Sequence, residues 1–177
     1  TLIGGDGDDT YVVDVPTDVV DETSVGSGGV DLLWVNATAT GSFTLPSNVE
    51  NGSVQSSVGV AITLLGNTLD NLLIGHGCNN SLSGSGGNDT LAGMGGNDTV
   101  DGGIGTDELQ LAGSQASYAI MRPSAAQTLF ASSNGNTLVS NVELIRFDGG
   151  APVTLASLLA TIGSPDPDTL TGGAGAD

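Results

Sequence analysis

Apolar side chains recur at a fixed interval in the middle of the chain. Between Gly66 and Gln110 every ninth residue is leucine or valine, and most of its neighbours are glycine or polar. These regularly spaced apolar positions are Leu73, Leu82, Leu91, Val100 and Leu109. Because alternate side chains of a strand point to opposite faces, one apolar residue in each nine predicts a very short strand with one inward side chain. The glycines between these positions predict tight turns.

The segments on either side show a less regular pattern. Short apolar runs alternate there with Gly, Ser, Asn, Asp and Thr, which predicts short strands in two β-rich segments, 13–65 and 111–162. The runs are VDLLWV, SFTL, ENGSV and VAITLL in the first segment, and YAIM, TLFAS, NTLVS and VELIRF in the second. Trp34 within VDLLWV fits a core position better than a sugar-stacking one.

The two β-rich segments also echo each other. TLPSNVE at 44–50 and TLVSNVE at 137–143 agree at six of seven places, which indicates a recurring strand, turn and strand. Their separation is not a multiple of nine, so the echo is expected to lie outside the phase of the central array. One short helix near 154–162 is expected after Pro152, with Thr154 as N-cap and Gly163 as its stop. Its apolar stripe comprises Leu155, Leu158, Leu159 and Ile162.

The central array consists of five consecutive nine-residue units. They read GNTLDNLLI, GHGCNNSLS, GSGGNDTLA, GMGGNDTVD and GGIGTDELQ. Each unit opens on glycine and carries Asn or Asp at its sixth place: Asn71, Asn80, Asp89, Asp98 and Asp107. A partial unit occupies 1–12, with Asp9 at the sixth place, and a further array begins over 163–177, with Asp168 and Asp177 at sixth places. Five units in one frame argue against a glycine-rich linker with accidental periodicity.

This pattern resembles GGxGxDxUx, the calcium-binding nonapeptide of the RTX family of bacterial proteins exported by type I secretion. The second segment adds a looser likeness, because NVELIRFDG at 141–149 is similar to stretches that follow RTX repeats. The resemblance implies an all-β fold, a parallel β-roll flanked by β-rich segments, with Ca²⁺ as the bound ion. The expected ligands are the sixth-place residues and the turn glycines Gly84, Gly86, Gly87, Gly93, Gly95, Gly96, Gly102 and Gly105.

The stacking of the units ranks the expected calcium sites by the number of carboxylates that each would contain. Two units make one coil of about 18 residues, so sixth-place side chains two units apart lie about 4.8 Å from each other. Carboxylate pairs with nearby carbonyl oxygens suit Ca²⁺ better than zinc or magnesium. Asp89 and Asp107 form the pair with two carboxylates and rank first, ahead of Asn80 with Asp98 and Asn71 with Asp89.

The two ends of the sequence are in phase with each other. A second copy placed after Asp177 would continue the nine-residue frame, which predicts one period of a longer tandem protein. Asp168 would then stack with Asp9 of the adjacent copy.

Composition narrows the possible partners. Twenty acidic residues against two basic ones give a formal charge of −18, which disfavours nucleic acid and anionic lipid. No apolar stretch approaches the roughly 18 residues of a membrane span. Cys78 is the single cysteine, so bound metal rather than a disulfide is expected to cross-link the fold. Because each unit buries so little apolar area, the array is expected to be largely disordered until it binds calcium.

Catalysis is not expected. His76 and Cys78 share one loop but have no second histidine or cysteine to complete a site, and acid pairs in the turns are already assigned to calcium. Self-cleavage at Asp166-Pro167 has no support in the flanking sequence. The sequence therefore predicts a non-enzymatic calcium-binding module of a secreted or cell-surface bacterial protein, such as an adhesin or surface-layer protein. The alternatives are the accessory repeats of a secreted enzyme and, more remotely, a carbohydrate- or ice-binding face, and the residues identify no protein or glycan partner.

Overall fold

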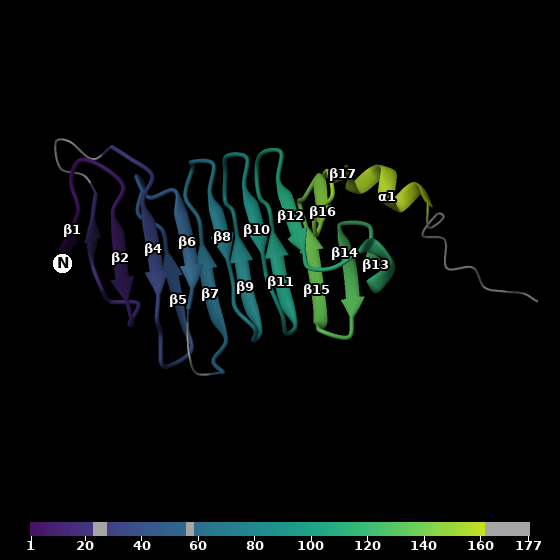
Figure 1. Cartoon of the computed structure of the whole chain (residues 1–177), viewed down its shortest axis with the longest axis horizontal. Coiled ribbons are helices and arrows are strands. Elements are labelled where there is room, and N and C mark those ends of the chain that lie inside the picture. Colours follow the sequence, from purple (N-terminus) through teal and green to yellow (C-terminus); the bar gives the residue numbers. More distant parts are fainter. Residues whose placement is uncertain (23–27, 56–58, 162–177) are drawn as a thin grey trace, which may run out of the picture.

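The computed structural model describes residues 1–22, 28–55 and 59–161. They form an elongated solenoid in which the chain winds between two facing sheets (Figure 1). Successive coils lie side by side along the long axis, so strands about 18 residues apart are neighbours within a sheet and strands consecutive in sequence face each other across the narrow core. The expected all-β parallel roll is confirmed.

Two large sheets build the described part of the chain. One contains, in spatial order, β17 (Val153–Thr154), β16 (Leu144–Phe147), β12 (Glu108–Leu111), β10 (Thr90–Ala92), β8 (Leu72–Ile74), β6 (Asn51–Val54), β4 (Leu32–Val35) and β2 (Thr10–Val13). The other contains β13 (Ala119–Ser124), β14 (Gln127–Ser132), β15 (Gly135–Ser140), β11 (Asp98–Asp101), β9 (Asn80–Ser83), β7 (Ile62–Leu65) and β5 (Gly41–Thr44). A small pair, β1 (Leu2–Ile3) and β3 (Val20–Asp21), lies at the N-terminal end. We call the first the β8 sheet and the second the β9 sheet.

The strand register confirms a coil of two units. Thr90 of β10 pairs in parallel with Leu72 of β8 on one side and with Glu108 of β12 on the other, a step of 18 residues each time. The β9 sheet repeats this step, since Thr99 pairs with Ser81. Units therefore alternate between the two sheets, and units two apart are neighbours.

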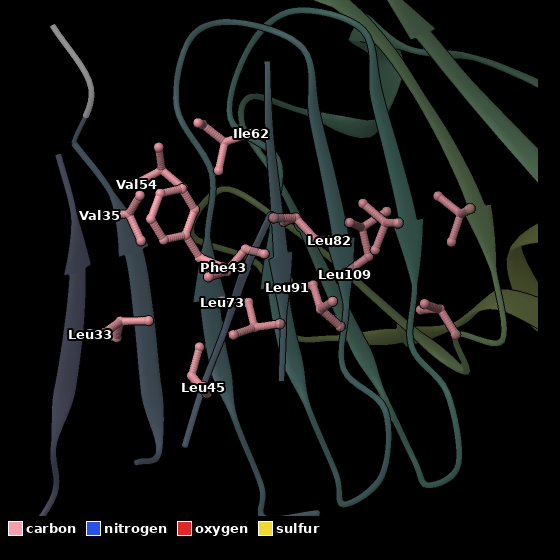
Figure 2. Packing of buried hydrophobic residues seen from close by; sticks show 14 of the residues in the cluster. Leu33, Val35, Phe43, Leu45, Val54, Ile62, Leu73, Leu82, Leu91 and Leu109 are labelled. Carbon is pink, nitrogen blue, oxygen red and sulfur yellow. The ribbon is translucent and has the colours of Figure 1, made fainter. Parts of the chain in front are cut away.

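The core is a row of inward side chains between the sheets. All five eighth-place residues are at most 1% exposed, as the sequence predicts. Figure 2 shows the leucines of this row stacked with Phe43 and Val54 from the flanking strands. Since the same cluster includes Leu33 and Ile145, the core runs without a break from β4 to β16.

The flanking segments extend the same sheets. The predicted apolar runs form β4 to β7 and β13 to β16, and β4, β6 and β16 stack in parallel on the central strands. The two copies of the 44–50 and 137–143 echo begin at different register positions, because Thr44 aligns through Leu65 with the ninth-place Ser83, whereas Thr137 pairs with the sixth-place Asp98. Both copies cross from the β9 sheet to the β8 sheet, and each ends on a glutamate immediately before a strand, Glu50 before β6 and Glu143 before β16. The turn of the second copy, 141–143, is three residues shorter than that of the first, 45–50, so the two glutamates alone share a stacking position.

Trp34 does not lie in the core. It is 38% exposed on the outer face of β4, because the inward positions of that strand are taken by Leu33 and Val35. The run VDLLWV does not alternate clearly between apolar and polar residues, so the sequence does not determine which of its side chains point inward.

The C-terminal end of the roll is covered. β13 to β15 form an antiparallel meander and β17 pairs antiparallel with β16. The expected helix is α1 (Leu155–Thr161), which lies beyond β17 at this end (Figure 1). Thr154 caps it as predicted, since the Ser157 backbone N–H donates to Thr154 Oγ1 at 3.1 Å. Leu158 inserts into the core, while Ile162 and Gly163 lie outside the described residues.

Candidate calcium centre

A column of acidic and amide side chains runs along the edge of the β8 sheet. In every parallel strand of this sheet the residue immediately before the strand is Asp, Glu or Asn. The members are Asp9, Asp31, Glu50, Asn71, Asp89, Asp107 and Glu143. The sixth place of the repeat is therefore one part of a longer column, which we call the carboxylate column.

Backbone N–H groups connect the column from coil to coil. The N–H of Asn71 donates to Asp89 Oδ1 at 2.7 Å, and that of Asp89 donates to Asp107 Oδ1 at 2.8 Å. The N–H of Asp107 in turn donates to Glu143 Oε2 at 2.9 Å. Each of these carboxylates thus uses one oxygen to hold the preceding coil and keeps the second for another partner.

The column continues in the same way at its N-terminal end. Asp9 N–H donates to Asp31 Oδ1 and Asp31 N–H donates to Glu50 Oε2, both at 2.8 Å. The β9 sheet has the shorter counterpart, with Asn80 N–H donating to Asp98 Oδ1 at 2.9 Å.

The structure adds Asp31, Glu50 and Glu143 to the predicted ligand column. A signal for Asp31 was present in the sequence, because 26–34 reads GSGGVDLLW and matches the unit GSGGNDTLA at six of nine places. The signal for the two glutamates was the NVE echo, which ends on both of them. These two positions hold glutamate where the nonapeptide has aspartate or asparagine, which obscured the match. The glutamate side chains nevertheless accept from a backbone N–H of the preceding coil, as aspartate does in the array.

The first-place glycines make room for these carboxylates. A Cβ atom on Gly84 would collide with Asp89 Oδ2 and with the carbonyl oxygen of Gly102. The same crowding by the unit's own sixth-place carboxylate recurs at Gly93, with Asp98, and at Gly102, with Asp107. A carboxylate oxygen and, at Gly84, a carbonyl oxygen from the neighbouring coil therefore border one small space, an arrangement that fits an oxygen-seeking cation.

The second oxygens of Asp89 and Asp107 are buried without a partner. Asp89 is 1% exposed and Asp107 is fully buried, and neither Oδ2 atom accepts a hydrogen bond within the described residues. Burial raises the pKa of Asp89 to about 6, the Asn71 N–H opposes that rise, and the charges of Asp107 and Asp70 add to it. Burial likewise raises the pKa of Asp107. A buried carboxylate oxygen without a donor is costly, and a bound cation would remove that cost.

Asp98 on the β9 sheet is a related case. Burial raises its pKa to about 6, while the backbone and side-chain N–H groups of Asn80 lower it. Among the described residues no three Asp, Glu, His or Cys side chains gather tightly enough to hold a metal by themselves. A bound cation at either sheet would therefore draw on backbone carbonyls and water as well as one or two carboxylates, as Ca²⁺ does.

Comparison with protein-family models identifies these repeats. The model described as the RTX calcium-binding nonapeptide repeat matches in four copies, over residues 1–14, 63–91, 74–109 and 162–177. The chain carries RTX calcium-binding repeats. Comparison with curated proteins finds no match.

Asn71 of the carboxylate column and Asn80 of the β9 sheet form hydrogen bonds within their own turns. Asn80 Nδ2 donates to the carbonyl oxygens of His76 at 2.8 Å and of Cys78, and His76 Nδ1 lies 2.7 Å from Asn80 Oδ1. Asn71 Nδ2 donates to the carbonyl oxygen of Glu50 at 3.0 Å and to Asn67 Oδ1 at 3.2 Å. In the Asn80 turn the amide NH₂ group therefore satisfies carbonyl oxygens, whereas in the Asn71 turn the amide oxygen Oδ1 is the atom next to Gly66. His76 is engaged in this turn, and Cys78 contributes a carbonyl oxygen to it.

The remaining predicted glycines of the RTX turns divide into two groups. Gly87, Gly96 and Gly105, at the fourth place, have positive φ and are crowded by a carbonyl group of the preceding coil. Gly86 and Gly95, at the third place, are not near a sixth-place carboxylate. The fourth-place glycines are thus required by backbone geometry, and the role of all five as carbonyl ligands stays a prediction. Asp168 and Asp177 lie outside the described residues.

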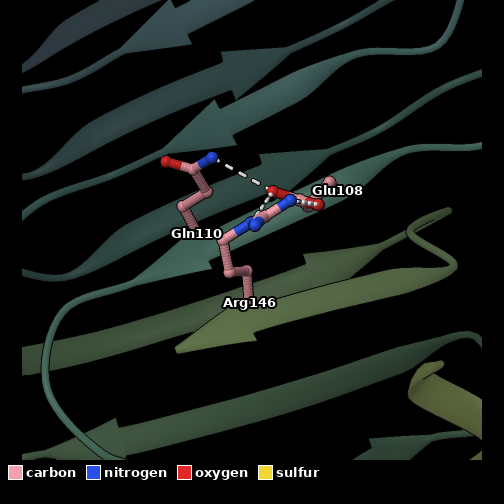
Figure 3. Close-up of polar contacts among 3 residues, drawn as sticks. All are labelled: Glu108, Gln110 and Arg146. Atoms are coloured by element: carbon pink, nitrogen blue, oxygen red, sulfur yellow. Dashed lines mark hydrogen bonds and ion pairs between the residues drawn. The ribbon is translucent and has the colours of Figure 1, made fainter. Parts of the chain in front are cut away.

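Glu108 follows Asp107 of the carboxylate column and is already paired with Arg146. Figure 3 shows its carboxylate held by Arg146, with Nε to Oε1 at 2.6 Å and the terminal nitrogen to Oε2 at 2.8 Å, and by Gln110 Nε2 at 3.0 Å. The hydrogen bonds from Arg146 lower the pKa of Glu108. This pairing keeps Glu108 on the outer face and away from the column.

Without calcium, acidification is expected to stabilise the roll. The pKa values of Asp89 and Asp98 rise from 3.8 to about 6 on folding, so between about pH 4 and 6 the folded state binds more protons than the unfolded state. Lowering the pH from 7 to 5 should therefore increase the free energy of unfolding by about 1.4 kcal/mol for each carboxyl group, because pH 5 lies about one unit below the folded-state pKa of about 6. Far-ultraviolet circular dichroism of the chelated protein at both pH values tests this, because the strand signal should be larger at pH 5, and a smaller strand signal at pH 5 would contradict it.

Proposed function

We propose that this chain is a calcium-binding structural module of a secreted bacterial RTX protein, and that it folds on binding Ca²⁺ outside the cell. The chain carries RTX repeats, and the observation that carries the proposal is the pair of buried, unpartnered oxygens Asp89 Oδ2 and Asp107 Oδ2 on adjacent coils. In the calcium-poor cytoplasm these carboxylates would repel each other and oppose folding. Outside the cell, calcium would bridge neighbouring coils and convert binding free energy into folding free energy.

A structural role in a surface protein such as an adhesin fits the described geometry. The solenoid is long and narrow, its two sheets run its whole length, and its core is continuous from coil to coil. Such a rod can space other domains, because each coil contacts only its neighbours and coils can be added in series. Within the described residues, no helix is both long and apolar enough to cross a membrane.

We also propose that the chain itself is not an enzyme. The buried carboxylates Asp31, Asp89 and Asp107 belong to the column, and the single histidine is within hydrogen-bond distance of Asn80 Oδ1. An enzyme whose accessory repeats these are would need a catalytic domain elsewhere in its polypeptide, so the neighbouring sequence distinguishes the two possibilities.

A calcium titration with ion counting tests the proposal. Asp107→Asn should bind at least one ion fewer than the unmodified chain while remaining folded in calcium, because the new amide can still accept from the Asp89 N–H and can fill the turn as Asn80 does. Asp148→Asn is the matched control, since Asp148 is exposed and only accepts from the Gly113 N–H. Equilibrium dialysis gives the stoichiometry. Equal ion counts in the Asp107 variant and the unmodified chain would refute the assigned site, and absence of calcium binding by the unmodified chain would refute the function.

A further inference from the structure

The N-terminal coil departs from the repeat at the position that follows β3. β1 and β3 pair in parallel, with Leu2 opposite Val20 and Ile3 opposite Asp21, a step of 18 residues. Continuing this register by one residue places Glu22 opposite Gly4. In the central array, Gly66 has Gly84 at the corresponding position, and Gly84 has Gly102. Glutamate therefore stands where the repeat has a first-place glycine.

The Glu22 side chain is buried and has no partner. It is 1% exposed, and neither of its carboxylate oxygens takes part in a hydrogen bond or ion pair within the described residues. The hydroxyl group of Tyr11, which is 4% exposed, is also without a partner. Tyrosine holds the eighth place of its unit, where the central array has leucine or valine, so this turn differs from the others at two positions.

These polar atoms converge on one point beside Gly4. At the position of a Cβ atom on Gly4, the nearest heavy atoms are the Tyr11 hydroxyl oxygen, Asp9 Oδ2 and Glu22 Oε1, the last at 2.5 Å. At Gly84 the corresponding neighbours are a carboxylate and a carbonyl oxygen. The N-terminal turn therefore exchanges the carbonyl oxygen of the central turns for a second carboxylate and adds a phenol oxygen.

Glu22 is buried and faces the half-buried Asp9, and a buried carboxylate that faces a second one needs a counter-charge. Lys and Arg cannot supply it, because the chain's two basic residues are Arg122 and Arg146, and both belong to the opposite end of the roll. The three oxygens match the hard ligands that Ca²⁺ prefers, and the remaining positions of its six to eight can be filled by carbonyl groups and water.

We propose a further divalent-cation site of the calcium class at the N-terminal coil, formed by Asp9 Oδ2, Glu22 Oε1 and the Tyr11 hydroxyl oxygen. It deepens the proposed function, since it lies outside the five-unit array and uses two residues, Glu22 and Tyr11, that the nonapeptide pattern does not mark as ligands. The site is complete within one chain, so Asp9 does not need a neighbouring copy to find a second carboxylate.

Terbium, which replaces calcium at oxygen sites, provides a local probe. A tyrosine next to bound Tb³⁺ sensitises its luminescence, and Asp89 lies four coils from Asp9 in the column, roughly 19 Å at about 4.8 Å for each strand. Tyr118 and Trp34 can also sensitise bound terbium, so the emission that is lost in Tyr11→Phe, and not the total emission, reports on the N-terminal site. Tyr11→Phe should lower the emission, and Glu22→Gln should remove the same part of it together with one bound calcium ion in equilibrium dialysis. Asp14→Asn, which changes an exposed acid of the same segment, should leave both unchanged.

The outcomes separate this site from the repeat sites. An unchanged calcium count and unchanged emission in Glu22→Gln, with calcium-dependent folding intact, would overturn the N-terminal site and leave the proposed function standing. Loss of calcium-dependent folding in the unmodified chain would overturn the proposed function instead. If Glu22→Gln fails to fold, Tyr11→Phe decides, because it removes one oxygen and retains the ring that packs in the core. Undiminished tyrosine-sensitised emission in that variant would overturn the site.

Discussion

A chelator is expected to abolish most of the strand signal of this chain at pH 7, and added calcium should restore it. Each nonapeptide buries one apolar side chain, too little to offset the ordering of nine residues. Ionised Asp89 and Asp107 on adjacent coils oppose folding further, because each has a buried oxygen without a donor. Far-ultraviolet circular dichroism with chelator, and then with excess calcium, measures the effect.

Magnesium is the control for this experiment. It favours a regular octahedral shell and gives up water reluctantly, so at the same concentration it should restore much less of the strand signal. A strand spectrum that is unchanged by the chelator would show that the roll folds without a cation, and would remove the basis for folding outside the cell.

Gly84→Ala is expected to damage the array severely. The added methyl group would occupy the space bordered by Asp89 Oδ2 and the Gly102 carbonyl oxygen, which is also the space assigned to the cation. We expect a loss of about 3 kcal/mol or more in the calcium-bound protein, at the upper end of overpacking effects. Calcium affinity should fall at least tenfold, which corresponds to about 1.4 kcal/mol.

Gly86→Ala in the same unit is the matched control. Its added methyl group would find no atom closer than the Ile104 carbonyl oxygen at 3.9 Å, and its φ is not positive. Thermal unfolding in saturating calcium, together with a calcium titration, compares the two variants. Similar losses in both would mean that glycine is needed there for its backbone freedom alone and not to leave space for a ligand.

The sequence was sufficient to predict the repeating part of this fold. A nine-residue period determines where each strand begins, which side chain points inward and which coil lies next to which, so Leu91 and Asp89 could be placed without coordinates. Outside the array the period is lost, and the stacking position is preserved by turns of varying length. For that reason Glu50 and Glu143, which continue the column, were recognisable only as a shared NVE motif.

The chemistry of individual turns was less accessible from sequence. Asn80 was expected to act as a weaker calcium ligand, yet its NH₂ group already satisfies the carbonyl groups of its turn. The burial of Glu22 could not be foreseen either, because an isolated glutamate in a polar segment normally remains in water. Both features depend on which atoms neighbouring coils bring together, and local sequence does not encode that.

The hydrogen bonds of the carboxylate column give the roll a polarity. Every described link runs from a backbone N–H to a carboxylate one coil nearer the C-terminal end, from Asp9 to Asp31 and finally from Asp107 to Glu143. The two ends of the roll are therefore chemically different faces. One presents the carboxylate of Asp9, which can receive a further coil, and the other is closed by the β13 to β15 meander and α1. A further coil could therefore stack on the Asp9 face through the same N–H to carboxylate link, whereas at the other end the meander and α1 cover the last described coil.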